Sequence, residues 1–239
     1  MINSNNKYVM RIAQYISRSG YSSRRDAEKI IKEKRVEVNG NIIESPALNV
    51  NQNDVVKIDN KIIEKFSSSV IYLYHKPKGL IVTKKDEKNR PTVFSNLPKN
   101  MRSLFSVGRL DKNSSGILLL TNDGMISRFL ELPSNKIVRK YLVQVDNELS
   151  DENLKSIRQG LLIDGFNYKP IKILKYFDRK KVFYTMNLSE GKNREIRNIM
   201  FYFRIKVIDL LRTSYGPYSL EELKPSEFIQ GNIKLLNIN

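Results

Sequence analysis

The sequence predicts an α+β fold: a small N-terminal α/β domain, then a larger domain with a mixed, largely antiparallel sheet flanked by helices. Three observations support this class. Apolar segments rich in β-branched and aromatic residues alternate with amphipathic segments of helical period, without a regular βαβ repeat. A polar, serine-rich stretch at residues 64–69 is typical of a linker. Of the 239 residues, 40% are hydrophobic, which is enough for a packed core.

The first domain is predicted over residues 8–66 and begins with two short helices. Apolar residues at helical spacing indicate a helix over residues 10–19. Ser22 or Ser23 can cap a second helix over residues 24–34, whose apolar and basic residues fall on opposite faces.

Short strands follow the two helices. Residues 36–43 alternate in polarity around Asn39-Gly40, which is the strongest short-range signal for a tight β-hairpin. A second alternating stretch, residues 54–63, completes the domain. We therefore expect a small sheet packed on two helices.

The larger domain is predicted over residues 70–239. Its expected strands are residues 70–76, 116–122, 140–145, 169–177 and 181–188. Its expected helices are residues 123–132, 150–160 and 193–203. Ser150 is a suitable N-cap for the second of these helices, and Gly160 ends it.

The chain carries a formal net charge of +17, with an isoelectric point near 9.9. Such an excess attracts polyanions, and nucleic acid or an anionic membrane surface are the usual partners. A lysine-rich composition can also reflect genome bias alone, so charge does not decide the function. Residues 1–66 carry +4 of this charge and the remainder +13, as expected if both parts contact one polyanion.

The residue types that are missing exclude several kinds of chemistry. The chain has no cysteine, which removes disulfides, thiol catalysis and cysteine-bound metal clusters. Its single histidine, His75, excludes a histidine-based metal cluster and argues against a Ser-His-Asp relay. No phosphate-binding glycine loop is present, so we expect no cofactor. The start lacks a secretory signal and no apolar run is long enough for a membrane, so we expect a soluble cytoplasmic protein.

The segment from Ser106 to Gly124 contains the main candidate for a catalytic residue. Asp111 stands between Arg109 and Lys112 in a polar loop, directly before an apolar strand. Neighbouring cations favour the ionised form of a carboxyl group, which suits a nucleophile or a base. The charge pattern alone leaves open a surface aspartate in a surface turn.

Residues 11–40, RIAQYISRSGYSSRRDAEKIIKEKRVEVNG, resemble the S4-like RNA-binding domain. The resemblance implies two short helices followed by a small twisted sheet. It also implies that basic residues at the start of the second helix, here Arg24, Arg25 and Lys29, meet RNA phosphates. Without the resemblance, these three residues could be a solvated helix face.

The chain as a whole resembles the bacterial ribosomal RNA pseudouridine synthases of the small-subunit/large-subunit type, with large-subunit type B as the nearest. Five motifs stand in the order of that family: HKPKGLIVT, GRLDKNSSGILLLTNDG, VRKYLVQV, LSEGKNREIRNIM and LLRTSYGPYSLEELKPSEF. His75 stands where the family usually has asparagine, and Arg139 where lysine is common. These two departures concern binding more than chemistry.

The resemblance implies three catalytic roles. Asp111 is the catalytic residue, Arg197 is its ion-pair partner, and Tyr141 stacks on the uracil and transfers a proton. Outside the family context, Tyr141 could be a core tyrosine and Arg197 a surface arginine.

The resemblance also implies contacts with RNA. Arg109, two residues before the catalytic aspartate, is expected to fill the gap that a flipped base leaves. Lys76 and Arg194, which lie in the first and fourth motifs, are expected to bind RNA as well.

We therefore expect site-specific isomerisation of uridine to pseudouridine in large-subunit ribosomal RNA, by a monomer that needs no metal and no cofactor. Two alternatives within RNA biology remain: a small-subunit RNA target, and a non-catalytic RNA-binding or ribosome-assembly protein that kept the fold. An RNA hydrolase or methyltransferase that uses Asp111 is a third alternative, although no methyl-donor loop is present.

Overall fold

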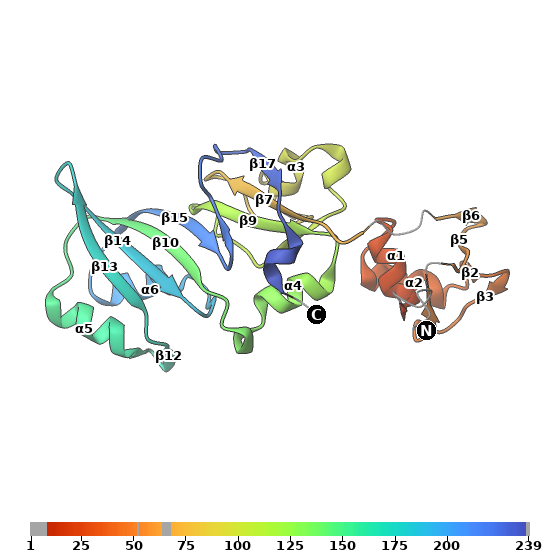
Figure 1. Cartoon of the computed structure of the whole chain (residues 1–239), viewed down its shortest axis with the longest axis horizontal. Coiled ribbons are helices and arrows are strands. Elements are labelled where there is room, and N and C mark those ends of the chain that lie inside the picture. Colours follow the sequence, from red (N-terminus) through yellow and green to blue (C-terminus); the bar gives the residue numbers. More distant parts are fainter. Residues whose placement is uncertain (1–8, 52, 64–67, 238–239) are drawn as a thin grey trace. The chain divides into compact units, whose positions relative to one another are not determined.

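The structure of the protein is a computed structural model that describes residues 9–51, 53–63 and 68–237. The chain forms two compact units, residues 1–69 and residues 70–239 (Figure 1). The linker expected at residues 64–69 stays a prediction, because residues 64–67 lie outside the described part.

The N-terminal unit consists of two helices and short strands. Its helices are α1 (Ile12–Arg18) and α2 (Arg24–Lys32). Its strands are β1 (Met10–Arg11), β2 (Val36–Val38), β3 (Asn41–Ile42), β4 (Asn49–Val50), β5 (Val56–Ile58) and β6 (Lys61–Ile62). Strands β3-β2-β5-β6 form one sheet in that order, and β1 pairs with β4.

Local sequence explains these elements. The hydroxyl of Ser23 accepts a hydrogen bond from the backbone of Asp26 and so caps α2. Ala27 and Ile31, on the side of α2 that faces the core of this unit, are completely buried. The hairpin between β2 and β3 turns at Asn39 and Gly40, both of which have positive φ. The predicted helices and hairpin of this unit are confirmed.

The second unit is built on a nine-stranded sheet with the order β13-β14-β10-β15-β9-β7-β17. Strand β16 pairs with β15, and β8 pairs with β9. The strands are β7 (Ile71–Lys76), β8 (Phe105–Val107), β9 (Ser115–Thr121), β10 (Arg139–Val145), β13 (Lys172–Asp178), β14 (Lys181–Leu188), β15 (Val207–Tyr215), β16 (Tyr218–Ser219) and β17 (Phe228–Gln230). Among the described strands of this sheet only β9 and β15 run parallel, so the predicted mixed, largely antiparallel sheet is confirmed.

Helices cover this sheet in two groups. They are α3 (Val93–Asn96), α4 (Gly124–Glu131), α5 (Asp151–Gln159) and α6 (Glu195–Tyr202), with short 3-10 turns at Lys99–Met101, Pro133–Asn135 and Ile233–Leu236. A separate hairpin joins β11 (Leu161–Ile163) to β12 (Phe166–Tyr168). Ser150 caps α5 and Gly160 ends it, as predicted.

The sheet has two halves, β13-β14-β10-β15 and β9-β7-β17, and each half packs against its own hydrophobic clusters. Helices α5 and α6 pack on one face of β13, β14, β10 and β15 (Figure 1). Strands β7 and β9 are covered on both faces, by α4 on one side and by α3 with the segment after it on the other. The parallel contact of β9 with β15 joins the halves.

Strand β15 is the longest strand of the described residues, and the sequence did not predict it. Its buried face includes Arg212 and Ser214, so the apolar alternation that marks a half-buried strand is interrupted. These polar residues lie at the junction of the two halves of the sheet.

Gly116 permits this junction. A Cβ atom at this position would lie 2.2 Å from the carbonyl oxygen of Arg212, and the φ angle of Gly116 is +111°. Only glycine allows the two backbones to approach this closely in that conformation.

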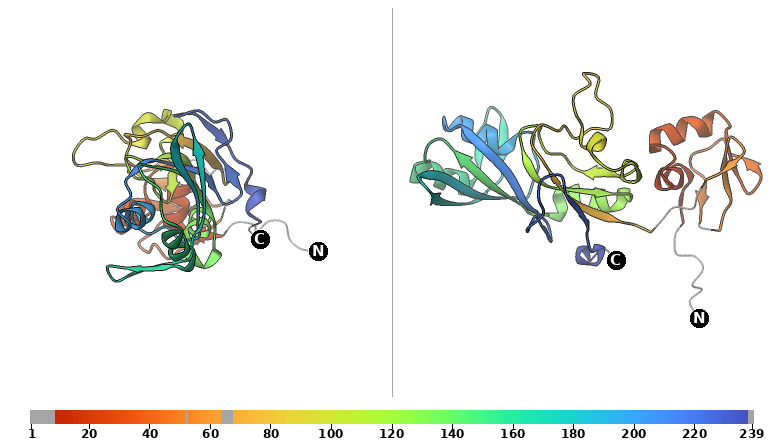
Figure 2. Two further views of the ribbon diagram at one scale, coloured as in Figure 1. Left: turned by 90° about the vertical axis from the view of Figure 1, so that its left-hand side faces the viewer. Right: turned by 90° about the horizontal axis from the view of Figure 1, so that it is seen from above.

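A long loop, residues 82–91, projects from the second unit and is drawn yellow in Figure 2. Within it, Arg90 forms an ion pair with Asp86 at 2.6 Å and also donates its backbone N–H to the same carboxylate. None of the described helices is long and apolar enough to cross a membrane.

Candidate active site

The loop between β8 and β9, residues 108–114, carries Asp111 and borders a cavity of about 880 Å³. Asp111 lines this cavity, and its side chain is 36% exposed. The remaining walls come from residues 81–90, from residues 188–197 and from side chains of β10 and β15.

Backbone and side-chain hydrogen bonds hold the Asp111 loop from several sides. The carbonyl of Asp111 accepts from the N–H of Ser114, and the carbonyl of Lys112 accepts from the N–H of Gly79. At the start of the loop, the N–H of Gly108 donates to Glu131 at 2.6 Å. These bonds place the carboxylate at the cavity in a defined position.

Lys76 binds the end of this loop through its side chain. Its side chain is fully buried, and its ammonium group donates to the carbonyls of Ser114 at 2.8 Å and Pro77 at 2.9 Å. Burial lowers the pKa of Lys76 to about 8, although Asp111 raises it. The prediction that Lys76 contacts RNA is wrong, because a side chain without exposed surface cannot reach a phosphate.

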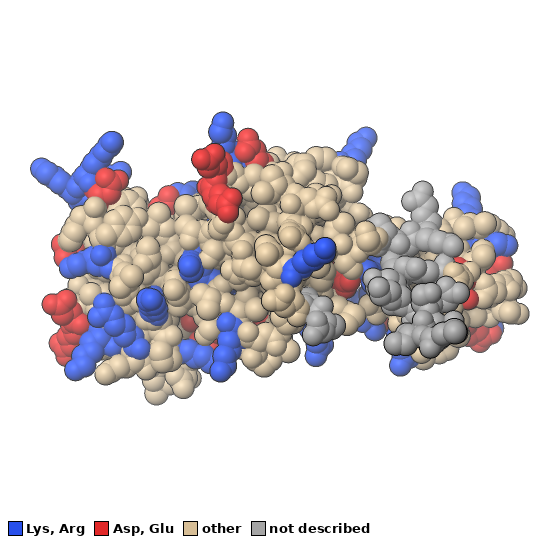
Figure 3. Space-filling model, in the orientation of Figure 1, with Lys and Arg blue, Asp and Glu red and all other residues tan. Residues whose placement is uncertain are grey.

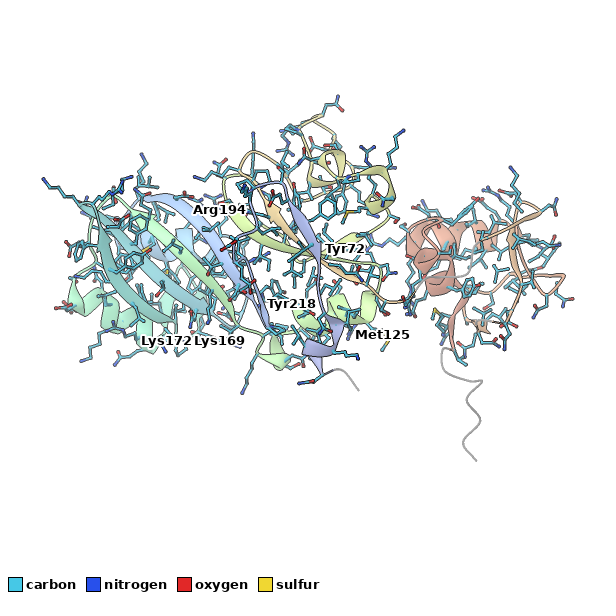
Figure 4. All side chains as sticks on the ribbon, turned by 45° about the horizontal axis from the view of Figure 1, so that its top comes forward. Tyr72, Met125, Lys169, Lys172, Arg194 and Tyr218 are labelled. Atoms are coloured by element: carbon cyan, nitrogen blue, oxygen red, sulfur yellow. The ribbon has the colours of Figure 1, made fainter. Side chains whose placement is uncertain are left out.

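The ion pair of Asp111 is made by Arg194, with 3.8 Å between the guanidinium Nη1 and the carboxylate Oδ2. Arg194 directly precedes α6 in a left-handed conformation with φ of 52°, and it is labelled in Figure 4. Arg194 lines the cavity, and its contact with RNA stays a prediction.

Arg197 lies one turn further along α6 and lines the same cavity. Its Nη2 donates to the carbonyl of Asn113 at 3.1 Å, and no ion pair joins it to Asp111 among the described residues. Burial and the neighbouring Arg194 lower the pKa of Arg197, whereas Asp111 and Asp209 raise it. The expected pairing of Arg197 with Asp111 is therefore corrected: Arg197 binds the loop backbone, and Arg194 makes the ion pair.

Tyr141 lies on β10 beside the cavity, in register with Met186 of β14 and Arg212 of β15. It is half-buried and packs against the hydrophobic clusters of both halves of the sheet. Arg109 is exposed at the rim of the same cavity. Thus Asp111, Tyr141 and Arg109 line one cavity. The roles that the resemblance implies for them stay predictions.

Two buried arginines form part of the cavity wall. Arg212 is only 2% exposed, and its Nε donates to the carbonyl of Ile117 at 2.8 Å. Arg139 donates to the hydroxyl of Tyr215 at 2.7 Å, and both guanidinium groups lie over the ring of that tyrosine, at 4.6 and 5.0 Å. The sequence analysis did not select Arg212; the available signal was a charged residue within the apolar alternation of the last motif.

Glu195 and Glu190 shape the segment that leads into α6. Glu195 is buried and accepts from the backbone of Lys192, while Glu190 accepts from the side chain of Lys192 at 2.9 Å. Glu190 also lies 4.0 Å from Lys169, which Figure 4 labels. Burial and the nearby Glu190 raise the pKa of Glu195 to about 7. The protonated form of Glu195 therefore fits its surroundings near neutral pH.

The basic residues of the N-terminal unit were predicted to bind RNA. Arg24, Arg25 and Lys29 are all exposed on α2, and Arg25 and Lys29 lie opposite its buried face. Arg24 makes a weak ion pair with Glu28 at 3.7 Å along the helix. Lys and Arg side chains, blue in Figure 3, also project at many points of the face shown there.

No group of three or more histidine, cysteine, aspartate or glutamate side chains in the described part of the chain is arranged to hold a metal ion.

Two family models match the sequence. The model of RNA pseudouridylate synthases matches residues 70–201, which include every cavity-lining motif except the last. The model of the S4 domain matches residues 10–64. The chain belongs to the RNA pseudouridylate synthase family. This enzyme is therefore an isomerase that acts on uridine in RNA, and it carries an S4 domain before its catalytic part.

Relatives of the synthase match along almost its whole length. A Rickettsia felis protein named as an uncharacterized RNA pseudouridine synthase is 43% identical over 230 residues, covering 95% of this chain and 99% of the relative. Ribosomal large subunit pseudouridine synthase B of Buchnera aphidicola is 36% identical, with 93% of each chain covered. The protein of the same name from Yersinia pestis is 32% identical, covering 90% of this chain and 70% of its own.

Among solved structures, a pseudouridylate synthase crystal structure superposes on the enzyme with a TM-score of 0.67. The two sequences are 24% identical, and the match covers 95% of this chain and 98% of that one. The likeness shows that both proteins share the same fold.

Proposed function

We propose that the protein converts a specific uridine of large-subunit ribosomal RNA to pseudouridine, with Asp111 as the catalytic residue. One observation carries the assignment of the residue: Asp111 lies at a cavity with Arg194 at 3.8 Å, and Tyr141 lines the same cavity. The RNA target follows from the relatives named for the large ribosomal subunit.

The reaction rearranges bonds within one nucleotide. The N1–C1′ bond of uridine breaks, the uracil turns, and a C5–C1′ bond forms while the C5 proton is lost and N1 gains a proton. In this cavity the carboxylate of Asp111 attacks or deprotonates the base–sugar unit, and Arg194 balances its charge. Tyr141 stacks on the uracil and moves the C5 proton.

The target uridine must leave its stack to reach Asp111, at a cost of a few kcal/mol. Arg109 stands exposed at the rim and fills the space that the base leaves, because a guanidinium can stack on bases and bind phosphate. The S4 domain holds the RNA through Arg24, Arg25 and Lys29.

Substitution of Asp111 by asparagine tests the assignment, because it keeps the size of the side chain and removes its charge. The variant should bind RNA like the parent and form no pseudouridine. Carbodiimide-dependent primer extension on ribosomal RNA measures the product, and turnover by the pure variant would exclude Asp111 as the catalytic residue.

The same primer-extension method, applied to both ribosomal RNAs from cells with and without the protein, identifies the target. A stop that disappears from the large-subunit RNA supports the proposal. Loss of a stop in the small-subunit RNA alone would assign the enzyme to the other subunit, and no lost stop would favour a binding protein.

A further inference from the structure

The exposed face of α6 carries an unusually exposed aromatic side chain. Phe201 is 82% exposed, more than any other large hydrophobic residue that the structure describes. Single exposed hydrophobic residues are common on protein surfaces and need no function. Phe201 differs from such residues in its position relative to the cavity.

Phe201 continues a stripe of residues that begins at the cavity. Arg194, Arg197 and Phe201 follow one another at three- and four-residue spacing, so they lie on the same side of α6. The opposite side of the helix is buried against the sheet by Ile196, Ile199 and Met200. Because Arg194 and Arg197 line the cavity, Phe201 stands just outside it, about 6 Å beyond Arg197 along the helix axis.

Further positive charge follows this aromatic side chain along the chain. Arg204 and Lys206, which follow the helix, are exposed and form no ion pair among the described residues. The nearby Asp209 is paired with Lys78 at 2.8 Å, and Asp146 accepts from the backbone N–H of Lys206. Along the chain, cations therefore stand both before and after Phe201.

This arrangement matches the way in which proteins bind single-stranded RNA. An exposed ring stacks on an unpaired base, and cations on either side bind the adjoining phosphates. A second copy of the chain is a poorer occupant, because two such faces would bring Arg197 and Arg204 against the same charges. An apolar protein partner would lack a counter-charge for these arginines.

We propose that Phe201 is a stacking platform for a base that neighbours the target uridine, with Arg204 on the adjoining phosphate. The proposal rests on the proposed function, since it takes the ligand of the cavity to be RNA. It adds a contact for the flanking nucleotide that holds the strand at the cavity entrance.

The absence of tryptophan from the chain allows a direct test. Phe201→Trp keeps a stacking ring and introduces the sole tryptophan, whose fluorescence reports contact with a base. A 12-nucleotide oligouridylate should quench this emission over the same concentration range in which binding is measured by filter retention. Inorganic polyphosphate should compete for binding without quenching, because it carries charge and no base.

A matched variant controls for quenching by any bound RNA. Leu174 on β13 is 55% exposed and follows Ile173, whose side chain is buried in the cluster that includes α6. Successive side chains of a strand point to opposite faces, so Leu174→Trp places a tryptophan on the other face of the sheet. Its emission should stay unchanged when oligouridylate binds.

Truncation of the ring measures the strength of the contact. Phe201→Ala should weaken oligouridylate binding roughly 5- to 100-fold, the range expected for loss of one base–aromatic stack. Phe201→Tyr should restore most of the affinity, because it restores the ring.

Three results would overturn the proposal. The first is bound oligouridylate with unquenched Phe201→Trp emission, and the second is equal affinity of the alanine variant and the parent. The third is emission that changes with protein concentration in the absence of RNA, which would make this face an interface between copies. Pseudouridine formation by the parent on ribosomal RNA is measured separately. Quenching of the Phe201→Trp emission by oligouridylate, with no product of the parent in ribosomal RNA, would reject the proposed function and keep base stacking at Phe201.

Discussion

At the scale of single residues, the two arginines near Asp111 have different neighbours, so their substitution should have different effects. Arg194 and Asp111 are both partly exposed and form an ion pair. Arg197 is less exposed than Arg194 and holds the carbonyl of Asn113, and its Nε is buried without a hydrogen-bond partner in the described structure. The first contact concerns the charge of the carboxylate, and the second concerns the position of its loop.

Substitution of each arginine by methionine separates the effect on the charge of Asp111 from the effect on the position of its loop. Arg194→Met should lower the rate of pseudouridine formation at saturating RNA with little loss of stability, because exposed ion pairs contribute less than about 1 kcal/mol. Arg197→Met should lower the free energy of unfolding by roughly 0.5–1.5 kcal/mol, because the hydrogen bond to the carbonyl of Asn113 is lost. Single-turnover rates and thermal melting measure both effects. An inactive Arg197→Met variant of normal stability, beside an active Arg194→Met variant, would reinstate Arg197 as the partner of Asp111.

Glu195 should make stability depend on pH. Its pKa in the folded protein is about 7, above the ordinary 4.5, so the unfolded chain ionises this group more easily. The stability that it contributes is full below pH 4.5 and is lost as pH rises through 7. Glu195→Gln removes this dependence, and the loss avoided at pH 8 is at most roughly 3 kcal/mol. Urea unfolding at pH 5 and pH 8 gives the free energy of unfolding of parent and variant. The variant should gain stability over the parent from pH 5 to pH 8, and the same difference at both pH values would contradict the raised pKa of Glu195.

Sequence motifs located the cavity but not every contact in it. Asp111, Tyr141, Arg194 and Arg197 all line it, and each of them lies in one of the five motifs of the sequence. Lys76 was misplaced because the burial of a lysine depends on what packs over it, and its cover comes from the loop that ends at Ser114. Such long-range contacts leave no local pattern.

At the scale of elements, regular patterns were predictable and interrupted ones were not. Strand β14 (Lys181–Leu188) and helix α5 (Asp151–Gln159) were predicted closely, because the first alternates regularly and the second has a cap and a stop. Strand β15 was missed because Arg212 occupies a buried position that apolar residues normally fill. Prediction from local apolar patterns thus fails where β15 pairs with β9, beside the cavity.

Gly116→Ala tests the close approach of β9 and β15. The added methyl group would lie 2.2 Å from the carbonyl oxygen of Arg212, and this oxygen belongs to the backbone and cannot move aside. We expect a loss of roughly 3 kcal/mol or more in stability. Gly124→Ala is the control, because nothing lies within 4 Å of its added methyl group. Equal melting temperatures of the two variants would show that the strands can separate without cost.

At the scale of the whole molecule, we expect the S4 domain to contribute to RNA binding and not to the chemical step. Changing Arg24, Arg25 and Lys29 to alanine should weaken RNA binding and reduce its salt dependence by about one unit of slope for each lost phosphate contact. The rate at saturating RNA should be largely preserved, because Asp111 and Tyr141 lie in the second unit. Single-turnover kinetics over a range of enzyme concentrations measures both quantities. A saturated rate that falls together with affinity would mean that the S4 domain helps to form the active site.

The parallel pairing of β9 with β15 also has a consequence for synthesis of the protein. It joins Gly116 to Arg212, and β17 later pairs with β7, the first strand of the unit. Contacts this distant in sequence form late, because the chain between them must first be present and its loop closed. A ribosome that has translated the codon of Arg197 has made every side chain assigned to catalysis. The nascent chain still lacks β15, which contributes Arg212 to the cavity wall. We therefore expect the enzyme to become active on RNA only after its last strands have left the ribosome that made it.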